Sequence, residues 1–166
     1  HPRVRRQRQM CIRDRLYTLN QLVAVLEYRK GRLAETGCKD LDAYNEATGE
    51  GLPRLVFACD EVAEMLDRTG RSKEDKELLA QIECRLATLA RLGRAFGIHL
   101  ILATQRPDAN VIPGQIKNNL DFRVCGRADD TLSSIILGNN SADDQIPKDA
   151  RGRFILQDGT VFQGYL

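Results

Sequence analysis

The chain has 166 residues, which suits one domain, and its 42% hydrophobic and 29% charged residues favour a packed core and exclude a disordered chain. The formal net charge is only +2, so any contact with nucleic acid would need a local basic patch. Tryptophan is absent and aromatic residues make up 5%, which argues against a stacking platform for single strands.

The cysteines and histidines argue against a metal centre. The five cysteines are scattered, none forms a Cys-x-x-Cys pair, and there are only two histidines, which is a poor basis for a zinc site. An odd number of cysteines fits reduced intracellular thiols. No apolar run reaches the roughly 18 residues of a transmembrane helix, and no signal peptide is recognisable. We therefore expect a cytoplasmic chain.

Residues 1–15 do not have the pattern of a folded segment. They are dense in arginine and glutamine and have little apolar periodicity. We expect a non-native or disordered leader, such as translated adapter sequence, and place the folded domain at residues 16–166. The alternative is a genuine basic arm that contacts phosphates.

One helix is predicted before the first strand and another after it. Leucines from Leu16 to Leu33 fall at helical spacing, and Gly37 follows at a position that often ends a helix. Ser72 with Asp75 forms a capping box at the start of a long helix. The basic residues of this second helix could form a DNA-binding patch, but we favour a solvated face in which glutamates are the counter-charges. These basic residues are Lys73, Lys76, Arg85, Arg91 and Arg94.

The first strand carries the main chemical signal. An apolar run from Arg54 to Cys59 ends in two adjacent acids, Asp60 and Glu61. Buried parallel strands have such continuous apolar runs, and ligands bind at their carboxyl ends. Asp60 could hold a hydrated Mg²⁺ that carries nucleotide phosphates, and Glu61 could orient or deprotonate the attacking water. This is the form of a Walker B element, although a solvated acidic turn is the alternative.

A second strand of the same kind runs from Gly97 to Ala103 and ends in a polar cluster, Thr104 to Pro107. His99 within it is expected to be a packed, hydrogen-bonded core residue and not a catalyst. Phe122 to Gly126 is predicted to be a third parallel strand.

The remaining elements are predicted from turn and cap residues. A short helix interrupted by Pro113 and Gly114 is expected between residues 108 and 120, and a helix capped by Asp129 or Asp130 is expected at residues 131–137, ending at Gly138. Asp-Gly at residues 158–159, between two apolar-rich runs, predicts a β-hairpin over residues 153–163.

Three stretches together resemble the motor domain of the FtsK/SpoIIIE family of DNA translocases. They are the strand that ends in Asp60-Glu61, the run Gly97-Ile-His-Leu-Ile-Leu-Ala-Thr-Gln-Arg-Pro107, and the segment from Asn110 to Arg123. The resemblance covers roughly Leu22 to Leu166, and the Ala-Thr-Gln-Arg-Pro run is its most specific part. Within the family, the chain is most similar to coupling ATPases of conjugative elements in Gram-positive bacteria.

The resemblance implies an α/β fold, namely the C-terminal half of a RecA-like P-loop NTPase domain. It has a parallel sheet of about three strands, flanking helices and a terminal β-hairpin. It also implies an ATP-driven motor that uses ATP and Mg²⁺ to move double-stranded DNA in conjugation or chromosome segregation. The motor would be a homo-oligomeric ring, expected to be a hexamer. Any attachment of the parent protein to the cell membrane would come from regions outside this chain.

The resemblance assigns roles to five residues. Asp60 would bind Mg²⁺, and Glu61 would polarise the hydrolytic water. Thr104 and Gln105 would sense the γ-phosphate of ATP. Arg123 matches the position of an arginine finger that faces the nucleotide of the adjacent subunit. Arg127 is a less favoured candidate for that role, and Arg106 is expected to hold the shape of its loop.

A P-loop of the form Gly-x-x-x-x-Gly-Lys-Ser/Thr does not occur in the chain. Its backbone amides and lysine hold the phosphates, so we expect the 166 residues alone to be inactive. In the family this loop lies before the Walker B strand, which implies a parent with a P-loop upstream of residue 1. Two alternatives stay open: a related ATPase that drives protein secretion, and a catalytically inactive interaction module.

Overall fold

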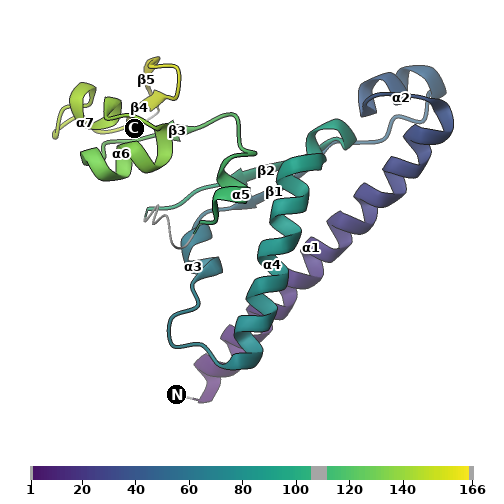
Figure 1. The fold of residues 1–166 in the computed structure, drawn as a ribbon, viewed down its shortest axis with the longest axis horizontal. Coiled ribbons are helices and arrows are strands. Elements are labelled where there is room, and N and C mark those ends of the chain that lie inside the picture. The colour runs from purple at the N-terminus through teal and green to yellow at the C-terminus, as the bar shows by residue number, and fades with distance from the viewer. Residues whose placement is uncertain (1, 106–111, 165–166) are drawn as a thin grey trace. The chain divides into compact units, whose positions relative to one another are not determined.

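The computed structural model describes residues 2–105 and 112–164, with side chains from residue 12 onward (Figure 1). Arg106, Pro107 and Asn110 lie outside the described residues. The chain divides into two compact units, His1–Thr104 and Gln105–Leu166. None of the described helices combines the length and the apolarity needed to span a bilayer.

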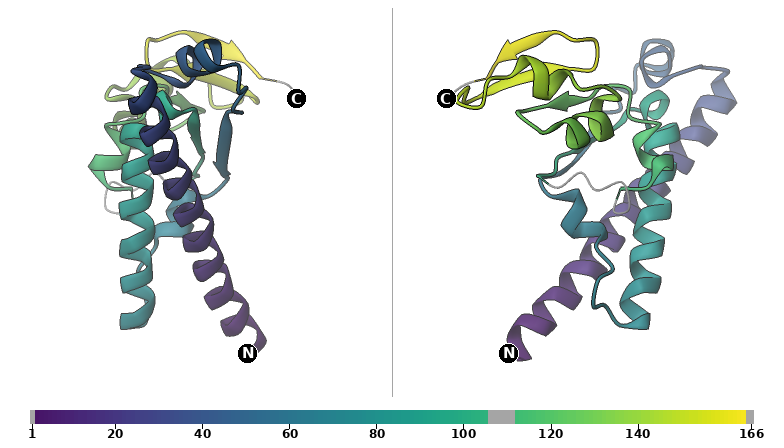
Figure 2. Two further views of the ribbon diagram at one scale, coloured as in Figure 1. Left: turned by 90° about the vertical axis from the view of Figure 1, so that its right-hand side faces the viewer. Right: turned by 60° about the vertical axis from the view of Figure 1, so that its left-hand side comes forward.

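The first unit is built from long helices and a pair of strands. Its elements are α1 (Pro2–Thr36), α2 (Leu41–Thr48), β1 (Leu55–Cys59), α3 (Val62–Leu66), α4 (Lys73–Leu92), the 3-10 helix η1 (Gly93–Phe96) and β2 (Ile98–Leu102). Helix α4 lies against α1 in all views (Figures 1 and 2). The contact buries one apolar stripe from each helix: Leu16, Leu19, Leu26 and Leu33 from α1, and Leu79, Ile82, Leu86 and Leu89 from α4.

Helix α1 extends further toward the N-terminus than expected. The boundary expected between residues 15 and 16 falls inside this helix. Ile12 is only 3% exposed because it continues the apolar stripe by one more turn, and Arg13 forms a 2.8 Å ion pair with Glu74 of α4. The folded segment therefore includes residues 12–15, and the non-native origin of residues 1–15 stays a prediction.

The ends of the two long helices confirm the capping predictions. Gly37 has a φ of +67°, and the bonds from Cys38 N to Leu33 O (3.0 Å) and from Gly37 N to Ala34 O (3.3 Å) form a Schellman motif. At the start of α4, the Ser72 hydroxyl accepts a hydrogen bond from the backbone N–H of Asp75. The cap residues Gly37 and Ser72 therefore set where α1 ends and where α4 begins.

Strands β1 and β2 pair in parallel, with Leu55 opposite Ile98 and Cys59 opposite Leu102. The prediction that both strands are buried throughout is wrong for one face of this sheet, where Val56 is 60% and Ile101 is 59% exposed. Within the described residues the helices of this unit cover only the other face. The sequence could not indicate this, because both faces carry apolar residues.

The second unit is an antiparallel sheet with short helices. Its elements are α5 (Gly114–Lys117), β3 (Val124–Cys125), α6 (Asp130–Leu137), α7 (Ser141–Gln145), β4 (Arg153–Leu156) and β5 (Val161–Gln163). The β4–β5 hairpin confirms the Asp-Gly prediction, and Gly159 adopts a φ of +88° in the turn. Asp129 caps α6 by accepting from the backbone N–H of Leu132, and Gly138 ends this helix, as expected.

The prediction of a third parallel strand at Phe122–Gly126 is wrong. Strand β3 has two residues and pairs antiparallel with β4, with Val124 opposite Leu156 and Cys125 opposite Ile155. The chain returns through α6 and α7 and brings β4 alongside β3 in the opposite direction, so the backbone groups of β3 pair there. Among the described residues, the parallel sheet therefore has two strands and not about three.

A small core closes the second unit. It consists of Cys125, Leu137, Ala142, Ile146 and Ile155. The buried Ser133 joins α6 to α7, because its hydroxyl donates to Asn139 O (2.7 Å) and accepts from Ala142 N (3.1 Å). Both bonds satisfy polar groups that would otherwise be unpaired inside the core.

Candidate functional site

The two predicted acids and the predicted sensor residue Thr104 lie at the same edge of the parallel sheet. The ladder continues past the strands: Ala103 N donates to Cys59 O (2.8 Å), and Val62 N donates to Ala103 O (2.9 Å). These two bonds flank the residues Asp60 and Glu61. The segment that carries the acids is therefore fixed to the end of β2 by backbone hydrogen bonds.

Within this edge, Glu61 and Thr104 are in direct contact. Both side chains are half-buried, and the Thr104 hydroxyl donates a hydrogen bond to Glu61 Oε1. Glu61 also occupies the N-cap position of α3, where its carbonyl accepts from Met65 N at 3.2 Å. The structure thus brings together two of the five residues to which the sequence assigned a role.

Asp60 differs from its neighbour because its side chain is exposed to solvent. Among the described residues, no group of three or more histidine, cysteine or acidic side chains could hold a metal ion. A single exposed carboxylate suits Mg²⁺, which keeps several water ligands and is usually held by one or two carboxylates together with substrate phosphates. Asp60 fits that requirement. It does not fit a metal site made entirely of protein ligands.

Arg123, the predicted arginine finger, lies in the second unit and is held by the backbone. Its guanidinium donates to the carbonyl oxygens of Lys117 (2.8 Å), Leu120 (3.0 Å) and Ile136 (3.3 Å). The ion pairs given for the described residues do not include Arg123. The bonds connect the ends of α5 and α6. Because a guanidinium has five N–H donors, two remain for another acceptor.

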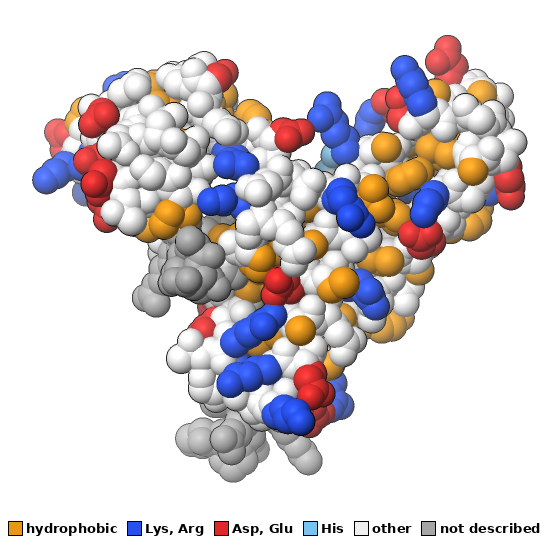
Figure 3. Space-filling model, viewed as in Figure 1, with side chains coloured by type: hydrophobic (Ala, Val, Ile, Leu, Met, Phe, Trp, Pro, Cys, Tyr) orange, Lys and Arg blue, Asp and Glu red, His pale blue; other side chains and the backbone are white. Residues whose placement is uncertain are grey.

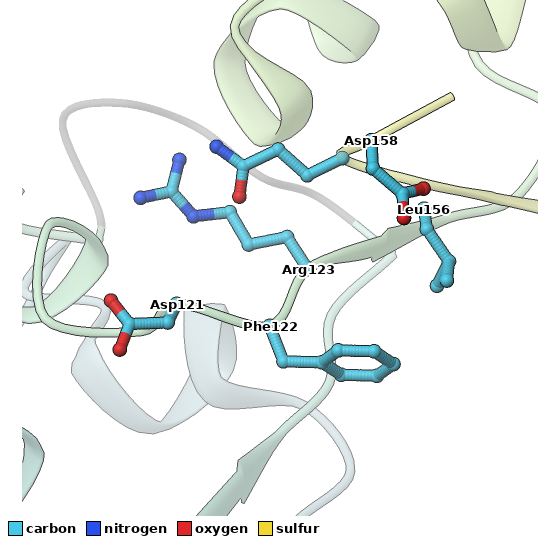
Figure 4. A pocket seen from close by; sticks show the side chains of 6 residues that line it. Asp121, Phe122, Arg123, Leu156 and Asp158 are labelled. Atoms are coloured by element: carbon cyan, nitrogen blue, oxygen red, sulfur yellow. The ribbon is translucent and has the colours of Figure 1, made fainter. Parts of the chain in front are cut away.

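A shallow cavity of about 300 Å³ lies beside this arginine (Figure 4). In the close-up, the Arg123 side chain and the exposed Phe122 ring project in different directions. The lining includes two carboxylates, which disfavour an anion inside the cavity. A phosphate would therefore have to approach Arg123 from another side. The lining residues are Asp121, Phe122, Arg123, Leu156, Gln157 and Asp158.

The other candidate residues have simpler surroundings. Arg127 forms an ion pair with Asp143 (2.6 Å) and donates to Ile146 O (2.8 Å), which connects the end of β3 to α7. Gln105 is exposed and belongs to the second unit. His99 is half-buried and its Nε2 atom has no hydrogen-bond partner in the described part of the chain, so the expected hydrogen bond is wrong for this atom.

The basic residues of α4 are interspersed with acids. In the space-filling view, blue side chains predominate over this part of the first unit, with a few red ones among them (Figure 3). Arg85 donates to Asn20 Oδ1 at 2.8 Å, and Arg68 pairs with Glu83 at 2.5 Å. The solvated face and the DNA-binding patch both stay predictions.

Sequence reasoning missed Arg29, which is only 3% exposed. It donates to Pro53 O (2.6 Å), just before β1, and to Phe96 O (2.7 Å), just before β2. Burial lowers the pKa of its guanidinium. The signal that could have revealed it is an arginine on the apolar stripe of α1, between Leu26 and Leu33.

Two parallel strands that end in adjacent carboxylates and a hydroxyl side chain are the arrangement of the Walker B and sensor strands in P-loop ATPases. Comparison with known proteins agrees with this class. The profile of the FtsK/SpoIIIE family matches residues 12–109. The DNA translocase FtsK of Campylobacter jejuni strain 81-176 is 34% identical over 123 residues, which are 72% of this chain and 12% of that protein.

Solved structures show the same relationship. A structure of the conjugation coupling protein TcpA of pCW3, in its monomer form with ATPgS, matches with 41% identity and a TM-score of 0.86, covering 92% of this chain and 44% of that one. The cytoplasmic domain of the Type VII secretion ATPase EccC of Thermomonospora curvata matches with 25% identity and a TM-score of 0.64, covering 90% of this chain and 16% of that one. The chain belongs to the FtsK/SpoIIIE family.

Proposed function

We propose that this chain is part of an ATP-driven motor that moves double-stranded DNA. The observation that carries the proposal is the site at the end of the parallel strands, where Asp60 and Glu61 follow β1 and Thr104 follows β2. The names of the relatives support DNA as the substrate. Because the chain spans 12% of the FtsK relative and 44% of the TcpA chain, the activity of the whole protein is part of the proposal.

The proposed chemistry divides the work between the two acids. Asp60, exposed to solvent, would hold the Mg²⁺ that accompanies ATP, and the ion would neutralise charge on the phosphates. Glu61, half-buried and held by Thr104, would orient or deprotonate the attacking water. The P-loop that binds the phosphates would be supplied by the parent protein. The 166 residues alone should therefore not hydrolyse ATP.

A protein-secretion ATPase is the second candidate, because the EccC structure shares the fold. The higher identity and TM-score of TcpA, 41% and 0.86 against 25% and 0.64, favour a role in conjugative DNA transfer. The FtsK relatives favour a related possibility, a role in chromosome segregation. We also propose that the parent protein assembles into a cytoplasmic ring, which we expect to be a hexamer.

The division of roles can be tested in a parent protein that includes a P-loop. Glu61→Gln keeps the shape of the side chain but cannot take a proton, so it should stop DNA-stimulated hydrolysis and preserve ATP binding. Asp60→Ala should instead weaken Mg²⁺-dependent nucleotide binding. Turnover and equilibrium binding of a fluorescent ATP analogue, measured with and without Mg²⁺, distinguish the two effects. Equal loss of ATP affinity in both variants would contradict the assignment.

We also propose that Arg123 acts across a subunit boundary. Arginine fingers supplied in trans contribute on the order of 10³ to 10⁵ in rate. Each of the variants Arg123→Ala and Glu61→Gln should be inactive alone, but rings that contain both should recover some turnover, because one interface combines an intact Glu61 with an intact Arg123. No recovery in verified mixed rings counts against the role.

The three carbonyl contacts of Arg123 require a folding control. Arg127→Ala is a matched variant, because Arg127 also donates to backbone carbonyls in the same unit. If Arg123→Ala unfolds the second unit as much as Arg127→Ala does, the carbonyl contacts explain its loss of activity.

A further inference from the structure

Two cationic side chains converge on the C-terminal end of helix α6. Lys117 Nζ donates to Ile135 O (3.1 Å), and Arg123 Nη1 donates to Ile136 O (3.3 Å). Carbonyls in the last turn of a helix lack an N–H partner further along that helix and carry its partial negative charge, so cations bind there favourably. The two bonds therefore satisfy neighbouring acceptors at one helix end.

Lys117 takes part in holding Arg123 in two ways. Its backbone carbonyl accepts a hydrogen bond from Arg123 Nη2 (2.8 Å), and its ammonium group occupies the acceptor next to the one that Nη1 uses. Both side chains are half-buried. The direction of the guanidinium thus depends on two acceptors for its terminal nitrogens, Lys117 O and Ile136 O.

The ammonium group limits where the guanidinium can go. Ile135 O is the neighbouring acceptor on α6, and Arg123 would have to turn from its present position to bond to it. While Lys117 is bonded to that oxygen, a second cation there is disfavoured because like charges repel. Without the ammonium group, Ile135 O loses this donor, and the guanidinium gains by moving to it because an unpaired acceptor away from water is unfavourable.

We propose that Lys117 is a positioning residue that acts through Arg123. Its ammonium group occupies the end of α6 and thereby keeps the guanidinium in the direction from which its two remaining N–H groups reach the nucleotide of an adjacent subunit. This inference rests on the proposed role of Arg123. Loss of the ammonium group should slow turnover and leave the affinity of each protomer for ATP unchanged.

The kinetic test uses three variants in a parent protein with its P-loop. Lys117→Met removes the charge and keeps an unbranched side chain, so kcat should fall on the order of 10- to 100-fold, with an unchanged Kd for a fluorescent ATP analogue. Lys117→Arg keeps a cationic donor and should restore most of kcat. Lys148→Met, which removes an exposed lysine from the same unit, should leave kcat unchanged. A Kd that rises in parallel with the loss of kcat, or an equal loss of kcat in Lys148→Met, would overturn the proposal.

Mixed rings distinguish action through Arg123 from a general loss of structure. Rings of Lys117→Met and Glu61→Gln protomers should recover turnover, because one interface combines an intact Glu61 with a correctly held Arg123. Rings of Lys117→Met and Arg123→Ala protomers should show no more turnover than Lys117→Met alone. The proposal is wrong if the second mixture recovers turnover, or if the first does not while rings of Arg123→Ala and Glu61→Gln do.

A measurement on the 166-residue chain needs no activity. The side-chain ¹⁵Nε–Hε resonance of Arg123 should move in Lys117→Met and stay close to its wild-type position in Lys117→Arg, because only the first variant removes the donor from Ile135 O. An unchanged resonance in Lys117→Met would refute the positioning. A moved resonance, combined with a parent protein whose turnover Arg123→Ala does not reduce, would instead reject the proposed role of Arg123 and keep the positioning of its side chain.

Discussion

The substitution Gly97→Ala should destabilise the first unit for two separable reasons. Gly97 connects η1 to β2 with a φ of +68°, and a left-handed backbone costs about 1–2 kcal/mol for a residue with a Cβ atom. The added Cβ would lie 2.2 Å from Leu41 Cδ2 and 3.2 Å from Arg29 Nη1. Overpacking of this kind costs about 1–3 kcal/mol, which gives a total of roughly 2–5 kcal/mol.

Gly70→Ala is the matched control for this prediction. Gly70 has nearly the same φ, +65°, but an added Cβ would meet no atom within 4 Å, so only the backbone cost of about 1–2 kcal/mol applies. The free energy of unfolding in urea, measured for the wild-type chain and both variants, gives the difference directly. If Gly97→Ala costs no more than Gly70→Ala, the close packing of Gly97 against Leu41 is refuted.

Further predictions concern buried groups. Arg29→Met should cost on the order of 2–5 kcal/mol in urea unfolding, because two carbonyl oxygens lose their donor; a neutral result would contradict the role of Arg29. Gly93→Ala should lower the free energy of unfolding, because the added Cβ would lie 2.5 Å from the Ile98 carbonyl oxygen. Gly31→Ala, where the added Cβ meets no atom within 4 Å, should instead raise the free energy of unfolding by about 0.5–1 kcal/mol. Burial raises the pKa of the Cys125 thiol, which should therefore react with a disulfide reagent at pH 8 more slowly than the exposed Cys84; equal rates would refute this.

Local signals in the sequence predicted most of the elements. The Ser72 cap, the Gly37 terminus and the Asp-Gly hairpin depend on hydrogen bonds between residues a few positions apart, and the structure confirms all three. Strand β1 was also predictable, because an apolar run followed by two acids is a local pattern. The fold class followed from the resemblance to the FtsK/SpoIIIE family.

Interactions between distant segments were not predictable. The direction of β3 depends on β4, about 30 residues further along the chain, which no local pattern specifies. Arg29 is bonded to carbonyls that are 24 and 67 residues away in the sequence. The contact between Thr104 and Glu61 requires the register of β1 against β2. Arg123 was expected to face the nucleotide of an adjacent subunit, and its bonds to three backbone carbonyls could not be predicted from the sequence.

The proposed site, built on Asp60 and Glu61, would drive movement of the parent protein along double-stranded DNA. Displacement of the third strand from a DNA triplex, by a parent protein that contains this chain and its P-loop, tests it most directly. We expect displacement that requires ATP and is abolished by Glu61→Gln, while that variant still binds ATP and DNA. ATP hydrolysis that double-stranded DNA does not stimulate, together with a triplex that stays intact, would contradict the account.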